Sequence, residues 1–367
     1  MWAYLKKEIV MTIAFVLAVV SAFFVHPDGG YAAYVDFRVL ALLFGLMLLV
    51  KGFQQIGLFD LLIQKVFGKV KNGRTLSQML VLLCFFLSMV ITNDVALITF
   101  VPFAIMALRL CHQEKLMIRV IVLQTMAANL GSMLTPIGNP QNLYLFTASG
   151  MGMGEFLKTM FPIALLSLIL LMAVTLLIPA EKITLQVEEK AKKMDQKLIL
   201  VYSALFVLNL LVVFRVLTWV PVLLITILGV VLVKKWNLLK EVDYALLLTF
   251  IGFFVFVGNI GRIPEISGLV EKLLTGREIL ISALFSQFLS NVPAALLLSG
   301  FTDQYRKLLV GVNIGGLGTL IASMASLISY KLYAVQEDAN KGKYMLTFTA
   351  WNVIGLVIML VFCDFWY

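Results

Sequence analysis

Charged residues are scarce in this sequence. Only 13% of its 367 residues are Asp, Glu, Lys or Arg, whereas 61% are hydrophobic. A soluble domain carries roughly 25% charged residues, so the polar surface that a soluble protein needs is missing. Apolar runs such as 10–25, 160–178 and 344–363 approach the roughly 20 residues that a helix needs to cross a lipid bilayer. The sequence therefore predicts an all-α polytopic membrane protein.

Cysteine and histidine are also rare. The three cysteines, Cys84, Cys111 and Cys363, lie far apart without a Cys-x-x-Cys spacing, and His26 and His112 are isolated. These residues support neither a disulfide framework nor a zinc site. Because no nucleophile or protease motif lies at membrane depth either, we expect no catalytic residues, no enzymatic activity and no cofactor. A bound Na+ ion is the one alternative that the sequence leaves open.

The formal net charge of +9 does not indicate a nucleic-acid partner. Most of the 29 basic residues lie in short loops between apolar runs, which is the pattern of the positive-inside rule rather than of a phosphate-binding face. Their distribution predicts a multi-pass protein of the inner (plasma) membrane with a cytoplasmic N-terminus and a C-terminus outside. The first run, 8–25, lacks a small-x-small cleavage site, so we interpret it as a membrane helix.

About nine segments are expected to cross the membrane: 8–25, 36–52, 117–148, 155–179, 197–215, 219–234, 244–260, 305–334 and 344–365. Two further segments, 76–110 and 279–301, have polar residues at their centres. Each arm of 76–110 has about 16 residues, or about 24 Å of helix, which is shorter than the roughly 30 Å hydrocarbon core. This length predicts a re-entrant hairpin. For 279–301 a single crossing is the alternative, and the charge distribution does not decide between the two.

Three blocks of sequence recur in the same order in the two halves of the chain. They are the apolar run after Asp36 and after Asp243, the Ser-x-x-x-(Thr/Ser)-Asn motif at 88–93 and 286–291, and the Asn-(Leu/Ile)-Gly motif at 129–131 and 313–315. The recurrence predicts two repeats, 1–180 and 219–367, joined by a cytoplasmic linker and a connecting helix within 181–218, and it favours a hairpin at 279–301. One connecting helix inverts the second repeat, as in many transporters. Asp36 and Asp243 are expected to cap helices.

Each repeat also contains an apolar crossing that is predicted to be discontinuous. In 117–148 the interruption contains two prolines, two glycines and several amides, and in 305–334 it is rich in glycine and hydroxyl groups. Irregular backbone at membrane depth is tolerated where it is buried in protein or lines a cavity. The hairpin tips and the two breaks are therefore the predicted binding site, where helix ends would offer partial charges to an anion and to a cation.

The candidate site residues are the polar groups at the tips and breaks. Those predicted to bind substrate are Thr92, Asn93, Asn139, Asn142, Ser290, Asn291 and Thr319. Those predicted to bind the coupling ion, including any Na+ at the hairpin tips, are Asp94, Asn93, Asn129, Gly131, Thr135, Asn291 and Asn313. Asp94 is the only acid expected near the midplane, where an acid is costly enough to be functional. The alternative is a structural Asp94 that is bonded to hairpin backbone amides.

At these motifs the chain resembles the ion transporter superfamily, in particular its arsenite-permease-like and citrate-transporter-like branch, over nearly its whole length. The most specific parts are Thr92-Asn93-Asp94, the stretch 129–142 and Ser290-Asn291-Val292-Pro293. The resemblance implies a scaffold domain, a mobile transport domain, an elevator-like movement and often a homodimer. Dicarboxylate:sodium symporters of the superfamily carry Ser-Asn-Thr at both tips, and this chain departs from that pattern at both.

We therefore expect secondary active transport of a small anion or oxyanion, coupled to Na+ or H+. Two alternatives stay open. One is a Na+/H+ antiporter that uses Asp94 as the exchanging acid. The other is an arsenite efflux permease, whose substrate would travel as neutral arsenous acid.

Overall fold

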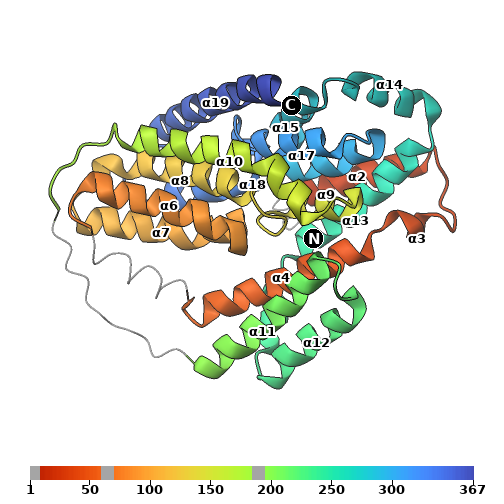
Figure 1. The fold of residues 1–367 in the computed structure, drawn as a ribbon, viewed down its shortest axis with the longest axis horizontal. Coiled ribbons are helices and arrows are strands. Elements are labelled where there is room, and N and C mark those ends of the chain that lie inside the picture. The colour runs from red at the N-terminus through yellow and green to blue at the C-terminus, as the bar shows by residue number, and fades with distance from the viewer. Residues whose placement is uncertain (1–8, 59–69, 184–194) are drawn as a thin grey trace.

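A computed structural model describes residues 9–58, 70–183 and 195–367. Within these ranges the chain is almost entirely helical, and its one β-type pairing is an isolated bridge between Asn72 and Lys182. Seven of the described helices are long and apolar enough to cross a membrane, and shorter apolar helices accompany them. The predicted all-α polytopic fold is therefore confirmed (Figure 1).

The helices follow the chain in the order that the repeats predict. Those of the first half are α2 (Ile9–Ala22), α3 (Tyr31–Tyr34), α4 (Phe37–Gln55), α6 (Gly73–Ile91), α7 (Asn93–Leu110), α8 (Met117–Ser132), α9 (Pro140–Ser149) and α10 (Met153–Thr175). Then come α11 (Gln196–Val213), α12 (Trp219–Leu232), α13 (Tyr244–Gly261), α14 (Pro264–Leu274), α15 (Glu278–Leu289), α16 (Asn291–Leu298), α17 (Tyr305–Ile314), α18 (Met324–Ala334) and α19 (Lys341–Trp366). Most of the predicted linker, 184–194, lies outside the described residues.

Matched aspartates begin matched helices. The Asp36 carboxylate accepts a hydrogen bond from the Val39 backbone N–H (3.0 Å) at the start of α4, and the Asp243 carboxylate accepts one from Leu246 (2.9 Å) at the start of α13. Each cap satisfies one of the backbone donors that the first turn of a helix leaves free. The predicted capping role of both residues is therefore confirmed.

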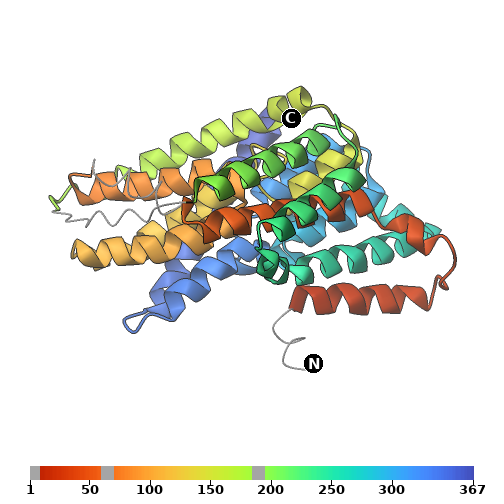
Figure 2. The ribbon, with the colours of Figure 1, turned by 90° about the horizontal axis from the view of Figure 1, so that it is seen from below.

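The described helices form two groups. In the first group α2 and α3 pack on α13, and α4 packs on α11, α12 and α13. The second group contains α6–α10 and α15–α19, which pack around α8 and α17. Figure 1 shows α4, α11 and α12 apart from α6, α7, α8, α10 and α19, and Figure 2 shows α2 along one edge of the molecule. The groups meet where α9 and α16 contact α4 and α13.

Two helix pairs in the second group fold back on themselves. α6 and α7 pack together and meet at Thr92, and α15 and α16 pack together and meet at Ser290. Thr92 has φ 71° and ψ 152°, and Ser290 has φ 73° and ψ 155°. Positive φ is uncommon for residues other than glycine. The sequence match between the two tips therefore extends to an unusual backbone conformation.

The length argument for the first hairpin is wrong. α6 has 19 residues and α7 has 18, and both are long enough to cross a membrane. α6 is longer than expected because the Asn72 side chain caps it before the apolar run begins. The hairpin follows instead from the position of its two ends. Gly73, at the start of α6, donates its N–H to the Glu181 carbonyl (2.9 Å), and Lys115, just after α7, lies 2.6 Å from the Glu181 carboxylate.

Ion pairs between loops agree with the predicted order of crossings. Two pairs join loops expected in the cytoplasm, Lys115–Glu181 and Arg109–Asp338, and two join loops expected outside, Arg262–Asp28 and Arg306–Glu155. The hydrogen bond from Lys115, with a second from Gln113, lowers the pKa of Glu181. The crossings are thus consistent with one another. That the Glu181 end faces the cytoplasm stays a prediction from the charge distribution.

Glycines allow the broken crossings to lie directly against the hairpins. A Cβ atom at Gly131 in α8 would lie 2.1 Å from the Phe85 carbonyl oxygen of α6. At the matched Gly315, a Cβ would lie 2.8 Å from the Ala283 Cα of α15. Both contacts are with backbone, which cannot rotate away. Gly131 therefore has a packing role, and its predicted role in ion coupling stays a prediction.

We expect Gly131→Ala to lower the free energy of unfolding by about 3 kcal/mol, because overpacking forces backbone shifts. The measurement is the thermal midpoint of the purified protein in detergent. Gly154→Ala is the matched control, since a Cβ at Gly154 in α10 meets nothing within 4 Å. Equal midpoints for the two variants would contradict the packing role.

Candidate binding site at the centre of the fold

Eight helix ends meet at the centre of the second group. α6, α8, α15 and α17 end there, and α7, α9, α16 and α18 begin there. Helix N-termini carry partial positive charge and C-termini partial negative charge. The two hairpin tips and the two breaks therefore bring both signs of partial charge to one place. Those breaks lie at 133–139, between α8 and α9, and at 315–323, between α17 and α18.

Two asparagines link the halves by exchanging partners. Asn129 ends α8 and Asn313 ends α17, and each bonds the start of the following helix in the other half. The bonds are Ser323 Oγ to Asn129 Oδ1 (2.9 Å), Asn129 Nδ2 to Ser326 Oγ (3.2 Å), Asn139 Nδ2 to Asn313 Oδ1 (3.1 Å) and Asn313 Nδ2 to Asn142 Oδ1 (2.6 Å). The spacing from Asn129 to Asn313 is the same as from Asn139 to Ser323 and from Asn142 to Ser326. The network is therefore symmetric, and all six side chains are buried.

The two hairpin tips differ in how they join this network. Asn93 donates its Nδ2 to Asn129 (3.1 Å) and its backbone N–H to the Gly138 carbonyl (3.1 Å). Asn291 has a single long side-chain bond, at 3.5 Å from the Ser290 hydroxyl. Its Nδ2 donates to no residue in the described part of the chain, although the side chain is 4% exposed. The second tip therefore holds a buried amide whose donor is unused.

Asp94 faces away from the asparagine network. It lines a cavity of about 180 Å³ between the two helix groups, together with Thr92, Asn139 and the charged Lys51, Glu241 and Asp243. No residue in the described ranges donates a hydrogen bond to its carboxylate; the Asp94 backbone N–H is bonded to Asn93 Oδ1 (3.0 Å). The structure thus does not show the backbone-bonded Asp94 of the alternative interpretation. Three acids and one lysine make this cavity favourable for a cation.

The hydroxyls of Thr135 and Thr319 hold the breaks against the hairpins. Thr135 donates to the Met89 carbonyl on α6, and Thr319 donates to the Gln287 carbonyl on α15 (2.9 Å). Asn142 Nδ2 in turn lies 3.0–3.4 Å from the carbonyls of Ser132, Met133 and Thr135 in the first break. The unwound carbonyls that were predicted to coordinate Na+ therefore face a side-chain amide.

Several residues of the site were missing from the predicted set. Ser323 and Ser326 are partners of Asn129, and their spacing, which repeats that of Asn139 and Asn142, could have identified them. Lys51, Glu241 and Asp243 line the Asp94 cavity from the first helix group. No sequence signal connects them to Asp94, because the contact exists only once the two helix groups pack.

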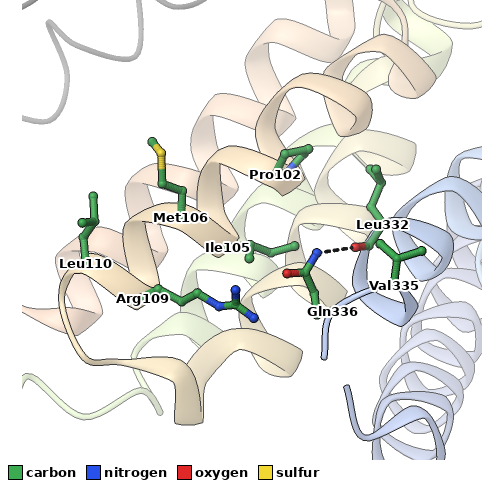
Figure 3. Close-up of a pocket in the computed structure, with 8 residues that line it drawn as sticks. All are labelled: Pro102, Ile105, Met106, Arg109, Leu110, Leu332, Val335 and Gln336. Carbon is green, nitrogen blue, oxygen red and sulfur yellow. Dashed lines mark hydrogen bonds between the residues drawn. The ribbon is translucent and has the colours of Figure 1, made fainter. Parts of the chain in front are cut away.

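A second cavity, of about 410 Å³, lies between α7 and α18 (Figure 3). It is lined by Pro102, Ile105, Met106, Arg109, Leu110, Leu332, Val335 and Gln336. The Arg109 side chain extends toward Gln336 and forms an ion pair with Asp338 (2.7 Å). This cavity contains none of the predicted site residues, so the candidate site is the asparagine network with the adjoining Asp94 cavity.

Broken helices in matched pairs, whose ends form a buried polar centre inside a polytopic membrane protein, are the architecture of a secondary transporter. The citrate transporter family (CitMHS) matches residues 1–304, and the chain belongs to that family. The resemblance to the citrate-transporter-like branch is thus confirmed.

Individual relatives agree with this assignment. An uncharacterized transporter of Methanocaldococcus jannaschii is 31% identical over 334 residues, which cover 90% of this chain and 91% of the relative. Inner membrane protein YbiR of Escherichia coli is 32% identical over 317 residues, covering 85% of this chain and 84% of its own. The human P protein is 34% identical over 116 residues, or 30% of this chain and 13% of its own. The family consists of transporters rather than enzymes.

Proposed function

We propose that this chain moves a small anion or oxyanion across the inner membrane, coupled to Na+ or H+. The observation that carries the proposal is the convergence of four helix N-termini, at α7, α9, α16 and α18, on a buried cluster of amides and hydroxyls. Helix N-termini with free N–H groups bind anions without a cationic side chain. The side chains of the described network are all asparagine or serine.

The second hairpin tip is the proposed point of substrate contact. Asn291 supports this role because its amide donor is buried and unused, and a buried donor without a partner is costly unless a ligand satisfies it. Ser290, Thr92 and Asn139 are the proposed further contacts. The family description names citrate, which makes citrate the first anion to test. Neutral arsenous acid is a further substrate to test, because the network needs no charge on its ligand.

Asp94 is the proposed coupling residue. Its carboxylate lines the cavity between the helix groups with Glu241 and Asp243, and this negative lining supports the approach of Na+ or H+. The same observation favours a second candidate function, Na+/H+ antiport at Asp94. Asn93, Asn129 and Asn313 are proposed to help position the ion at the helix ends.

An elevator-like movement of the second helix group against the first is the proposed mechanism. The contact between the groups is partly aromatic: Tyr144 on α9 packs against Phe250 and Phe254 on α13, with ring centroids 6.2 and 5.6 Å apart. Apolar contacts of this kind can slide without breaking strong hydrogen bonds. We further propose a homodimer in the lipid bilayer, with a cytoplasmic N-terminus and a C-terminus outside.

Uptake by purified protein in liposomes tests this function. Liposomes are loaded to give an inward gradient of Na+, of H+ or of neither, and labelled citrate, oxyanions or arsenous acid are supplied outside. We expect one of these solutes to accumulate with a single gradient and to leave when an ionophore collapses that gradient. Exchange of Na+ for H+ without any requirement for an anion would replace the proposal with the antiporter.

A further inference from the structure

The second break closes around the side chain of Gln287. Gln287 lies on α15, three residues before the hairpin tip. Its Nε2 is 2.9 Å from the Gly315 carbonyl, 2.9 Å from the Leu317 carbonyl and 3.0 Å from the Ala283 carbonyl. Its Oε1 accepts a bond from the Thr319 backbone N–H (2.8 Å). One amide group, with two hydrogens, therefore faces three carbonyl oxygens.

The loop is shaped to accept this side chain. Gly318 has φ 105°, and a Cβ there would lie 2.2 Å from Gln287 Oε1. No side chain larger than hydrogen fits at that position while Gln287 occupies the loop. In the first half the matched residues are Leu134 and Met89, and methionine has no N–H to donate. The position of Gln287 thus distinguishes the two breaks, although Thr319 and Thr135 bond the matched backbone carbonyls in the same way.

Carbonyl oxygens that converge inside a membrane protein need a positive partner. Unpaired carbonyls cost free energy in a medium without water. Rings of backbone carbonyls can replace the hydration shell of a monovalent cation, and unwound helix carbonyls coordinate Na+ in transporters. Gly315 and Leu317 offer such carbonyls, and the partial positive charge of an amide N–H group satisfies them in place of an ion.

We infer that the Gln287 amide takes the place of a monovalent cation in the second break, and that its removal creates a Na+ site there. The ligands would be the carbonyl oxygens of Gly315 and Leu317 with the backbone carbonyl of Gln287, completed by water. The break itself would then contribute no coupling ion in the unaltered protein. This inference concerns ion binding alone and does not depend on which solute the protein transports.

Thermal unfolding in detergent tests the inference, followed with a thiol-reactive fluorophore because Cys84, Cys111 and Cys363 are buried. Midpoints are compared in NaCl and in N-methylglucamine chloride of equal concentration. For Gln287→Met we expect a lowered midpoint without Na+ and a saturable recovery with Na+, larger than any Na+ effect on the wild type by about 5 °C. Gln287→Glu keeps an acceptor for Thr319 but replaces the donor with a charge, so its Na+ effect should be larger still.

Gln124→Met is the matched control. Gln124 also donates its amide to two backbone carbonyls, those of Leu80 and Phe100, but both belong to regular helices. This variant should lose stability without gaining a response to Na+. A Gln287 variant that can be purified only in Na+ is the strongest form of the expected result. Gln287 variants that respond to Na+ as the wild type does, or that fold in neither salt, would overturn the inference and leave Gln287 as a brace for the loop.

Discussion

Asp94→Asn is expected to abolish accumulation of substrate against a gradient while leaving the fold intact. The carboxylate lines the cavity between the helix groups and receives no hydrogen bond from the described residues, so the isosteric amide removes charge without removing a structural bond. A side chain that neither binds a cation nor titrates cannot link ion movement to substrate movement. A proton gradient of one pH unit can support about tenfold accumulation, and in the variant it should support none.

Two measurements separate lost coupling from lost transport. Exchange of labelled for unlabelled substrate across liposomes at equal concentration needs no gradient, so Asp94→Asn should retain it. Glu155→Gln is the matched control, because Glu155 forms an ion pair with Arg306 away from the cavity. That variant should accumulate substrate as the wild type does. Gradient-driven accumulation by Asp94→Asn at the wild-type level would make Asp94 structural and move the coupling group elsewhere.

The sequence was sufficient to locate the hairpin tips and the breaks, because polar residues inside an apolar run have few structural explanations. Thr92 and Ser290 indeed share one backbone conformation, and Asp36 and Asp243 both cap helices. Counting residues was less reliable. Asn72 caps α6 before the apolar run, which lengthens the helix beyond what hydropathy indicates.

Pairing between the tips and breaks could not be predicted in the same way. Each predicted asparagine was matched with its counterpart, Asn129 with Asn313, whereas the bonds of Asn129 run to Ser323 and Ser326 in the other half. Matched residues in a two-fold arrangement need not touch, since each can bond the partner of its counterpart. The sequence contains the spacing, but the exchange of partners depends on the packing of the two halves. The boundaries of the repeats stay a prediction.

Asn291 and Asn313 are predicted to respond in opposite ways to the same substitution. Asn291→Ala should reduce substrate uptake by about tenfold, since a charge-assisted hydrogen bond to a ligand contributes about 1.5 kcal/mol or more. Its thermal midpoint should stay close to that of the wild type, because the only side-chain bond lost is the 3.5 Å contact with Ser290. Asn313→Ala removes partners from the buried Asn139 and Asn142 and should lower the free energy of unfolding by about 3 kcal/mol.

Uptake and thermal midpoint, measured on the same preparations, make this contrast decisive. A site built only to hold the halves together would show stability losses at both positions and uptake losses in proportion. A binding site at the second tip instead requires uptake to fall at Asn291 while the midpoint does not. Normal uptake by a folded Asn291→Ala variant would remove the second tip from the substrate site, and contact with the substrate would then have to come from Thr92 and Asn139, the site residues that line the cavity beside Asp94.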